Sequence, residues 1–137
     1  ENEAVNLILS SFAGRARKKE IEIKIQCAIP ADFTVSESDL CVLLSNALEN
    51  ALHACVPLAA EGRSCEIDVN FYERNKHLFL QVVNDCKAPI KFQNGIPVSD
   101  MEGHGIGVQS ICAIVQRYGG VFSFAEKDGK FTLRLSL

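Results

Sequence analysis

The chain has 137 residues and a formal net charge of −3 at pH 7, and 47% of its residues are hydrophobic. This length and composition predict one domain over residues 1–137, with a core that buries about two thirds of the unfolded chain's surface. Acidic and basic residues are mixed along the sequence, which argues against a general nucleic-acid-binding protein.

Hydrophobic periodicity and turn residues divide the chain into eight elements. The first half is expected to form a helix over 2–19, a strand over 20–29 and a helix from Ser36 or Ser38 to about Leu52 or Ala60. The second half is expected to form strands over 65–72 and 78–83 joined by a turn at 74–76, an irregular loop over 87–102, a helix over 106–118, and a hairpin of 121–125 and 131–137 around 127–130.

This order of elements predicts the fold class. The pattern α-β-α-β-β-α-β-β favours an α/β (α+β) protein in which a mixed, mostly antiparallel sheet carries helices on one face, as a two-layer sandwich. The basic run RARKK at residues 15–19 falls at the end of the first helix. There it is more typical of a solvated helix end than of a binding patch.

The six cysteines are widely scattered and form no CxxC pair. Most stand inside apolar patterns, so we expect buried free thiols in a reducing cytosol rather than disulfides or a zinc site. The sequence has no signal peptide and no apolar run near 18 residues. Because it begins in mid-helix without a Met, we expect it to be a domain excised from a larger protein.

The segment LLSNALENALHAC, residues 43–55, carries a polar stripe. On a helix, Asn46, Asn50 and His53 lie within roughly 60° of arc, with the apolar residues on the opposite side. Stacked amides can ligate a hard cation through their oxygens and hydrogen-bond phosphate or water. The alternative is a surface stripe without a task.

The segment EGHGIGVQSICAIVQRYGG, residues 102–120, places alternating glycines before a helical pattern. Gly103, Gly105 and Gly107 let the backbone approach a ligand, and the free N–H groups of the first helical turn favour an anion such as phosphate. The Walker A lysine and a preceding buried strand are both missing from this segment, so other phosphate-loop motifs fit poorly. A flexible connector before a helix is the alternative.

The two segments together, separated by two strands, resemble the nucleotide-binding domain of the GHKL superfamily. NALENALHA resembles the N box and GHGIG the second glycine box of that family. The closest resemblance is to the ATPase domain of sensor histidine kinases of the quorum-sensing and citrate-sensing types. It implies a Bergerat-type ATP-binding fold with ATP and Mg²⁺ as cofactors.

The resemblance also implies roles for the polar stripe. Asn50 would hold Mg²⁺ against the ATP phosphates, and His53 stands where many members carry a phosphate-facing Lys or Arg. Asn46 takes the place of the Glu general base of the gyrase-type hydrolases. Because an amide cannot accept a proton from water at neutral pH, Asn46 favours phosphoryl transfer over hydrolysis. Glu49 is a second, weaker candidate for a base.

The remaining expected contacts to the nucleotide come from two further segments. Asn84 aligns with the family's Asp that reads the adenine amino group. The rest of the family's first glycine box is absent from this segment. The alternative is that Asn84-Asp85 starts a turn. Residues 86–102 would form the ATP lid. The expected phosphate-binding residues are Gly103, His104, Gly105, Ile106 and Gly107.

The function implied by the resemblance is that of the catalytic domain of a two-component sensor histidine kinase. It would transfer the γ-phosphoryl group of ATP to a His on a separate dimerisation domain of the same parent protein, and act on a response regulator only indirectly. The resemblance implies that the accepting His lies on a dimerising helical hairpin, and none of His53, His77 and His104 stands in such a setting. We therefore expect a monomeric fragment that does not phosphorylate itself, from the cytoplasmic part of a bacterial membrane-bound sensor.

Two alternatives stay open. One is an anti-sigma-factor-like kinase that phosphorylates Ser on a partner protein. The other is a non-catalytic interaction domain whose nucleotide site has decayed, which the altered first glycine box favours and the two intact boxes oppose.

Overall fold

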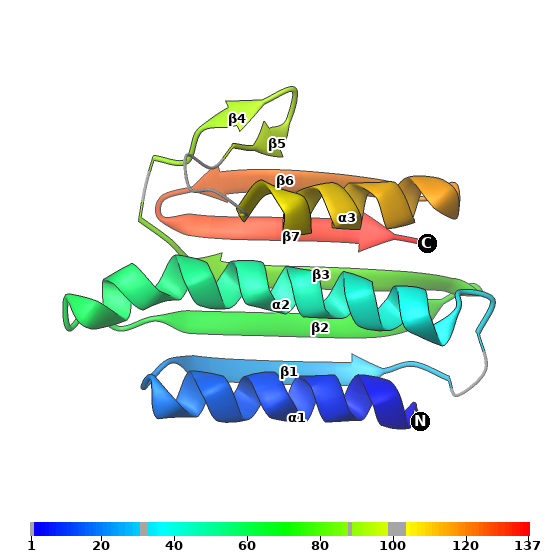
Figure 1. The fold of residues 1–137 in the computed structure, drawn as a ribbon, viewed down its shortest axis with the longest axis horizontal. Helices are drawn as coiled ribbons and strands as arrows, with labels where there is room; N and C mark the ends of the chain where they lie inside the picture. Colours follow the sequence, from blue (N-terminus) through cyan, green and yellow to red (C-terminus); the bar gives the residue numbers. More distant parts are fainter. Residues whose placement is uncertain (1, 31–32, 88, 99–103) are drawn as a thin grey trace.

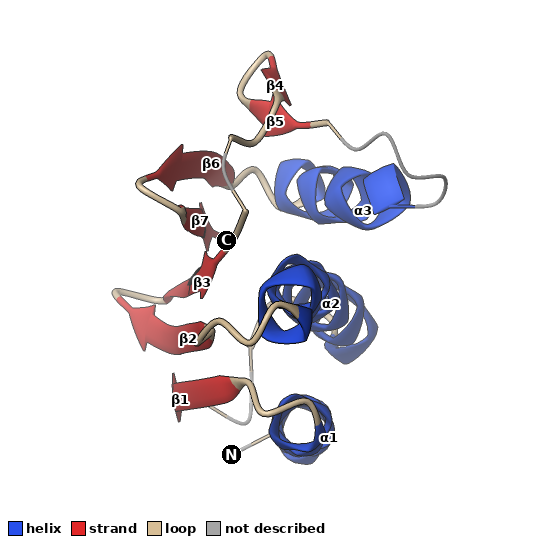
Figure 2. Cartoon of the chain, turned by 90° about the vertical axis from the view of Figure 1, so that its left-hand side faces the viewer, coloured by secondary structure: helices blue, strands red, loops and turns tan. Residues whose placement is uncertain are grey.

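Three helices cover one face of a five-stranded sheet (Figure 1). The computed structural model describes residues 2–30, 33–87, 89–98 and 104–137, with the backbone alone at 104–106. Seen along the layers, α1, α2 and α3 stand side by side on one side of the sheet, and no described helix covers the other side (Figure 2). The predicted two-layer architecture is therefore confirmed.

The sheet has the strand order β1-β2-β3-β7-β6. Only β1 and β2 run parallel, because α2 crosses over between them, and all other neighbours are antiparallel. The strands are β1 Glu22–Ala28, β2 Glu66–Arg74, β3 His77–Asp85, β6 Val121–Lys127 and β7 Lys130–Ser136.

The helices are α1 Glu3–Lys18, α2 Glu37–Ala60 and α3 His104–Arg117. The Oγ atom of Ser36 caps α2 by accepting the Asp39 N–H at 3.1 Å, and α2 runs to the later of its two predicted ends. Among the described residues, α2 is the one helix long and apolar enough to cross a membrane. Its apolar stripe is buried in this fold, which accounts for that composition: Leu40, Leu43, Leu44, Ala47, Leu48, Ala51, Leu52, Cys55 and Leu58.

The central strands alternate between the helix layer and the open face. In β2, Ile67, Val69 and Phe71 are buried, and β3 continues the pattern from Leu78 to Asn84. Asn84 is 1% exposed and is the one buried polar residue in the described part of the chain. Its burial places an amide on the helix side of the sheet.

A short hairpin stands in the segment predicted to be irregular. Strands β4 (Phe92–Gln93) and β5 (Ile96–Pro97) pair around Asn94-Gly95, whose φ angles of 54° and 77° suit a tight hairpin turn. The Phe92 ring stacks on Phe131 of β7, with 6.3 Å between centroids. Part of the predicted lid thus packs on the end of the sheet, while residues 88 and 99–102 of that lid lie outside the described residues.

The prediction of free thiols is wrong for one pair. Cys55 of α2 and Cys65, which precedes β2, are joined by a disulfide, with Cα atoms 5.9 Å apart. The prediction holds for Cys86 and Cys112, which are buried thiols outside any disulfide, whereas Cys27 is exposed. The pair is brought together because the chain turns back between α2 and β2, which sequence spacing alone does not reveal.

The disulfide should stabilise the fold. It closes a loop with a sequence separation of 10 residues, so Cys65→Ser should lower the free energy of unfolding by about 2–3 kcal/mol on the chain-entropy account. Denaturant titration without reductant measures this, and Cys41→Ser is the matched control expected to leave the midpoint unchanged. A wild-type midpoint that does not move when dithiothreitol is added would contradict the cross-link.

Candidate functional site

Helix α3 lies antiparallel to α2 (Figure 1). Hydrogen bonds hold its C-terminal end on the first turn of α2. The Nη1 atom of Arg117 lies 2.9 Å from Oδ1 of Asp39, and the Tyr118 hydroxyl donates to Oδ2 at 2.5 Å. The same hydroxyl accepts the Ser36 N–H at 3.1 Å. We call this network, formed by Ser36, Asp39, Arg117 and Tyr118, the clasp.

The other end of α3 touches α2 at Asn46. A Cβ atom built at Gly107 would lie 3.2 Å from Oδ1 of Asn46, closer than an ordinary van der Waals contact. Glycine therefore permits the first turn of α3 to approach the side-chain amide directly. Two segments singled out by their sequence, far apart along the chain, are brought together here.

This packing positions the rest of the polar stripe. Asn50 lies one turn beyond Asn46, about 6 Å further along α2, and His53 follows in the same direction. Because α3 runs antiparallel to α2, both residues lie along α2 beyond the level at which α3 begins. Asn46 and Asn50 are half-buried, and His53 is exposed.

The N-terminal end of α3 supplies the anion-favouring partner of the stripe. Its first N–H groups have no partners within the helix, and the helix dipole adds positive potential at this end. The helix begins at His104, two residues earlier than predicted, so residues 104–107 form its first turn. Gly103 lies outside the described residues.

The donor set suits a phosphate with its counter-cation. No group of three or more His, Cys, Asp or Glu side chains that could hold a metal occurs within residues 2–30, 33–87, 89–98 and 104–137. A Mg²⁺ ion bound to phosphate oxygens keeps several waters and needs few protein ligands. The amide oxygen of Asn50, beside an anion-favouring helix end, fits that requirement.

Glu49, the weaker candidate base, is engaged by a residue of α1. Arg15 donates to it through two nitrogens, with Nη1–Oε2 at 2.8 Å and Nη2–Oε1 at 3.1 Å. These hydrogen bonds hold the pKa of Glu49 below its usual value. His53 places Nε2 3.5 Å from Oε1 of the same carboxylate. In this arrangement Glu49 is less basic than an isolated carboxylate.

Asn84 and Asp85 at the end of β3 have different surroundings. The Nδ2 atom of Asn84 donates to the backbone carbonyl of Asp85 at 3.0 Å. The Asp85 carboxylate accepts the Glu66 N–H at 2.8 Å and pairs with Lys130 at 2.7 Å. Asn84 is a paired strand residue in register with Ile67, so the interpretation as the start of a turn is wrong.

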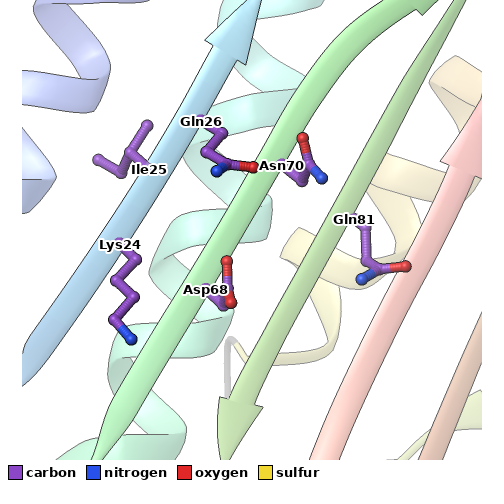
Figure 3. A pocket seen from close by; sticks show the side chains of 6 residues that line it. All are labelled: Lys24, Ile25, Gln26, Asp68, Asn70 and Gln81. Atoms are coloured by element: carbon purple, nitrogen blue, oxygen red, sulfur yellow. The ribbon is translucent and has the colours of Figure 1, made fainter.

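A hollow on the open face of the sheet is lined by residues that do not belong to the polar stripe (Figure 3). This depression has a volume of about 480 Å³ and lies over β1, β2 and β3. It contains none of the predicted site residues. Its lining consists of Lys24, Ile25, Gln26, Asp68, Asn70 and Gln81.

Two features of the site were not predicted. Arg15 belongs to the run RARKK, whose place at a helix end was expected, but no local pattern indicates its partner on α2. The clasp joins residues about 80 positions apart, with sequence separations of 78, 79 and 82. Only the acidic first turn of α2 and the basic last turn of α3 hint at it.

The comparisons with known proteins identify the family and the fold. Residues 35–137 match the family model described as a GHKL domain. This chain belongs to the GHKL domain family. No curated protein sequence matches it.

Solved structures of histidine kinase catalytic domains have the same fold. The catalytic domain of histidine kinase ThkA superposes with a TM-score of 0.73 at 16% identity, covering 98% of this chain and 91% of that one. The mycobacterial sensor histidine kinase MprB superposes with a TM-score of 0.65 at 16% identity, covering 97% of this chain and 93% of that one. The Acinetobacter baumannii histidine kinase AdeS superposes with a TM-score of 0.67 at 9% identity, covering 98% of this chain and 62% of that one.

The clasp should make the free energy of unfolding depend on pH in the acidic range. The Tyr118 hydroxyl, followed by Arg117 and Ser36, lowers the pKa of Asp39. In the unfolded chain an Asp carboxyl has a pKa of about 3.9, and in the folded protein the pKa of Asp39 is lower. The contribution of Asp39 to the free energy of unfolding is therefore complete above the unfolded pKa and is lost as the pH falls through the folded pKa. Tyr118→Phe should therefore be less stable than wild type at neutral pH and lose less stability below about pH 4.

Thermal unfolding midpoints measured from pH 7 to pH 2.5 test this expectation. Tyr72→Phe is the matched control, since the Tyr72 ring stacks on Phe79 away from the clasp, and its curve should run parallel to that of wild type. A Tyr118→Phe curve that is also parallel to wild type would contradict the stated role of the hydroxyl.

Proposed function

We propose that this chain is the catalytic, ATP-binding domain of a two-component sensor histidine kinase. It would transfer the γ-phosphoryl group of Mg²⁺-ATP to a His on a separate dimerisation domain of the same parent protein. The observation that carries the proposal is the contact between Gly107 and Asn46, which places the polar stripe of α2 beside the N-terminal end of α3. Membership of the GHKL family supports it.

The residues of the stripe take distinct roles in this proposal. Asn50 holds Mg²⁺, and the backbone N–H groups of residues 104–107 bind the phosphates. Asn46 cannot act as a general base, so water is not activated and the γ-phosphoryl group is kept for an incoming acceptor. His53 faces the phosphates from the far end of the stripe.

Asn84 reads the adenine base in this proposal. Because its Nδ2 atom donates to the Asp85 carbonyl, the amide is oriented and Oδ1 is the atom left to accept a hydrogen bond from the adenine amino group. The amide supplies this acceptor without the charge of an aspartate. We therefore expect a weaker hydrogen bond to the base than a carboxylate would give.

The acceptor and the partners lie outside this chain in the proposal. His53 belongs to α2, which packs on the sheet, and His77 is the first residue of strand β3, so neither stands on a dimerising helical hairpin. The domain would be monomeric and not phosphorylate itself, and a response regulator would receive the phosphoryl group in a later step. We place the parent among bacterial membrane-bound sensors of the quorum-sensing or citrate-sensing type, with this domain in the cytoplasm.

Asn50→Ala should abolish Mg²⁺-dependent binding of a non-hydrolysable ATP analogue while the fold is kept, because the variant removes the cation ligand alone. Titration calorimetry with and without Mg²⁺ measures this, and a thermal midpoint near that of wild type checks the fold. Asn70→Ala, in the open-face depression, is the matched control and should bind like wild type. Unchanged affinity in Asn50→Ala would show that the cation ligand is misassigned.

Asn84→Asp should tighten adenine nucleotide binding by roughly threefold to tenfold, because a charged acceptor makes a hydrogen bond about twice as strong as a neutral one. The same calorimetric titration measures the change. Equal or weaker affinity would count against Asn84 as the base-reading residue. Absence of nucleotide binding in wild type at millimolar concentrations would instead favour the non-catalytic interaction domain.

A further inference from the structure

The ion pair between α1 and α2 stands at the edge of the proposed nucleotide site. Arg15 lies outside residues 35–137, the part of the chain that matches the family model. Its guanidinium lies over the Phe12 ring, 4.7 Å from the centroid, and binds both carboxylate oxygens of Glu49. The side chain is thus held on two sides, by a ring of its own helix and by a carboxylate of the next.

The carboxylate that Arg15 binds is badly placed for an anion site. Glu49 lies between Asn46 and Asn50 in the helix, and its Oε1 atom is 3.5 Å from Nε2 of His53. A negative charge there lies within one Debye length of phosphates bound beside the stripe, so it would repel them even in partly solvated surroundings. An anion site with an uncompensated carboxylate at its edge would be weakened by its own residue.

We propose that Arg15 is a positioning residue of the nucleotide site, which compensates the charge of Glu49 and thereby lets a nucleoside polyphosphate bind beside it. The inference rests on the proposed function and deepens it, since it makes a residue of α1 necessary for full affinity. Arg15 acts through Glu49 and does not touch the ligand. Its effect therefore grows with the number of phosphates and vanishes for an uncharged nucleoside.

The test compares Arg15→Gln, Glu49→Gln and the double variant by calorimetry with a non-hydrolysable ATP analogue, ADP and adenosine, all with Mg²⁺. Arg15→Gln should weaken binding of the ATP analogue by roughly threefold to tenfold, weaken ADP less, and leave adenosine unchanged. Glu49→Gln should bind at least as tightly as wild type. The double variant should recover wild-type affinity, because it removes the repelling charge as well as its compensation.

Several results would overturn the inference. If the double variant stays as weak as Arg15→Gln, Arg15 binds the ligand directly and does not compensate Glu49. If Arg15→Gln lowers the thermal midpoint but binds all three ligands like wild type, the ion pair is structural. Arg17→Gln, on the same helix, is the control expected to change nothing, and Arg15→Lys keeps the charge if the glutamine variant does not fold.

The failure of this inference differs from that of the proposed function. If wild type binds none of the charged ligands, the proposed nucleotide site is rejected, and the proposed role of Arg15 is rejected with it. If wild type binds the charged ligands with Mg²⁺ and Arg15→Gln binds them with equal affinity, the nucleotide site stands and only the compensating role of Arg15 is rejected.

Discussion

The packing of α3 against α2 is the constraint on which the candidate site depends. At one end the clasp fixes the last turn of α3 on Asp39, and at the other end Gly107 lets the first turn approach Asn46. With both ends fixed, the N-terminal end of α3 is directed at the amide stripe of α2. A side chain at position 107 or a loose clasp would move the two halves of the site relative to each other.

The proposed nucleotide site consists of neutral side chains and a helix end rather than of charged side chains. Asn46, Asn50 and Asn84 offer amide oxygens, and the carboxylate of Glu49 is paired with Arg15. The absence of carboxylates from the positions that face the phosphates reduces repulsion of an anion. It also removes the groups that would activate water, which agrees with a domain that delivers a phosphoryl group to another protein segment.

Much of the fold follows from local patterns in the sequence. The apolar stripe of α2, the cap at Ser36 and the strict alternation of β2 and β3 are short-range signals, and each predicts its element within a few residues. A helix was also predicted over residues 106–118, and α3 begins two residues earlier, at His104, so that Gly105 and Gly107 lie inside it. These elements follow from local backbone and burial preferences.

The features that were missed depend on contacts between distant segments or on very short elements. The disulfide of Cys55 and Cys65 forms because α2 and β2 turn back on each other, and the partner of Arg15 is set by the packing of two helices. The β4–β5 hairpin has strands of two residues, too short for a period to be read, although Asn94-Gly95 carried the turn signal.

The central claim is that nucleotide binds between the stripe of α2 and the N-terminal end of α3. The most direct test is a map of backbone amide chemical shifts by NMR as a non-hydrolysable ATP analogue is added with Mg²⁺. We predict the largest changes at Asn46, Asn50 and Gly107, with little change at Asp68 and Asn70 on the open face. Changes concentrated on the open face, or no saturable change at millimolar nucleotide, would contradict this account.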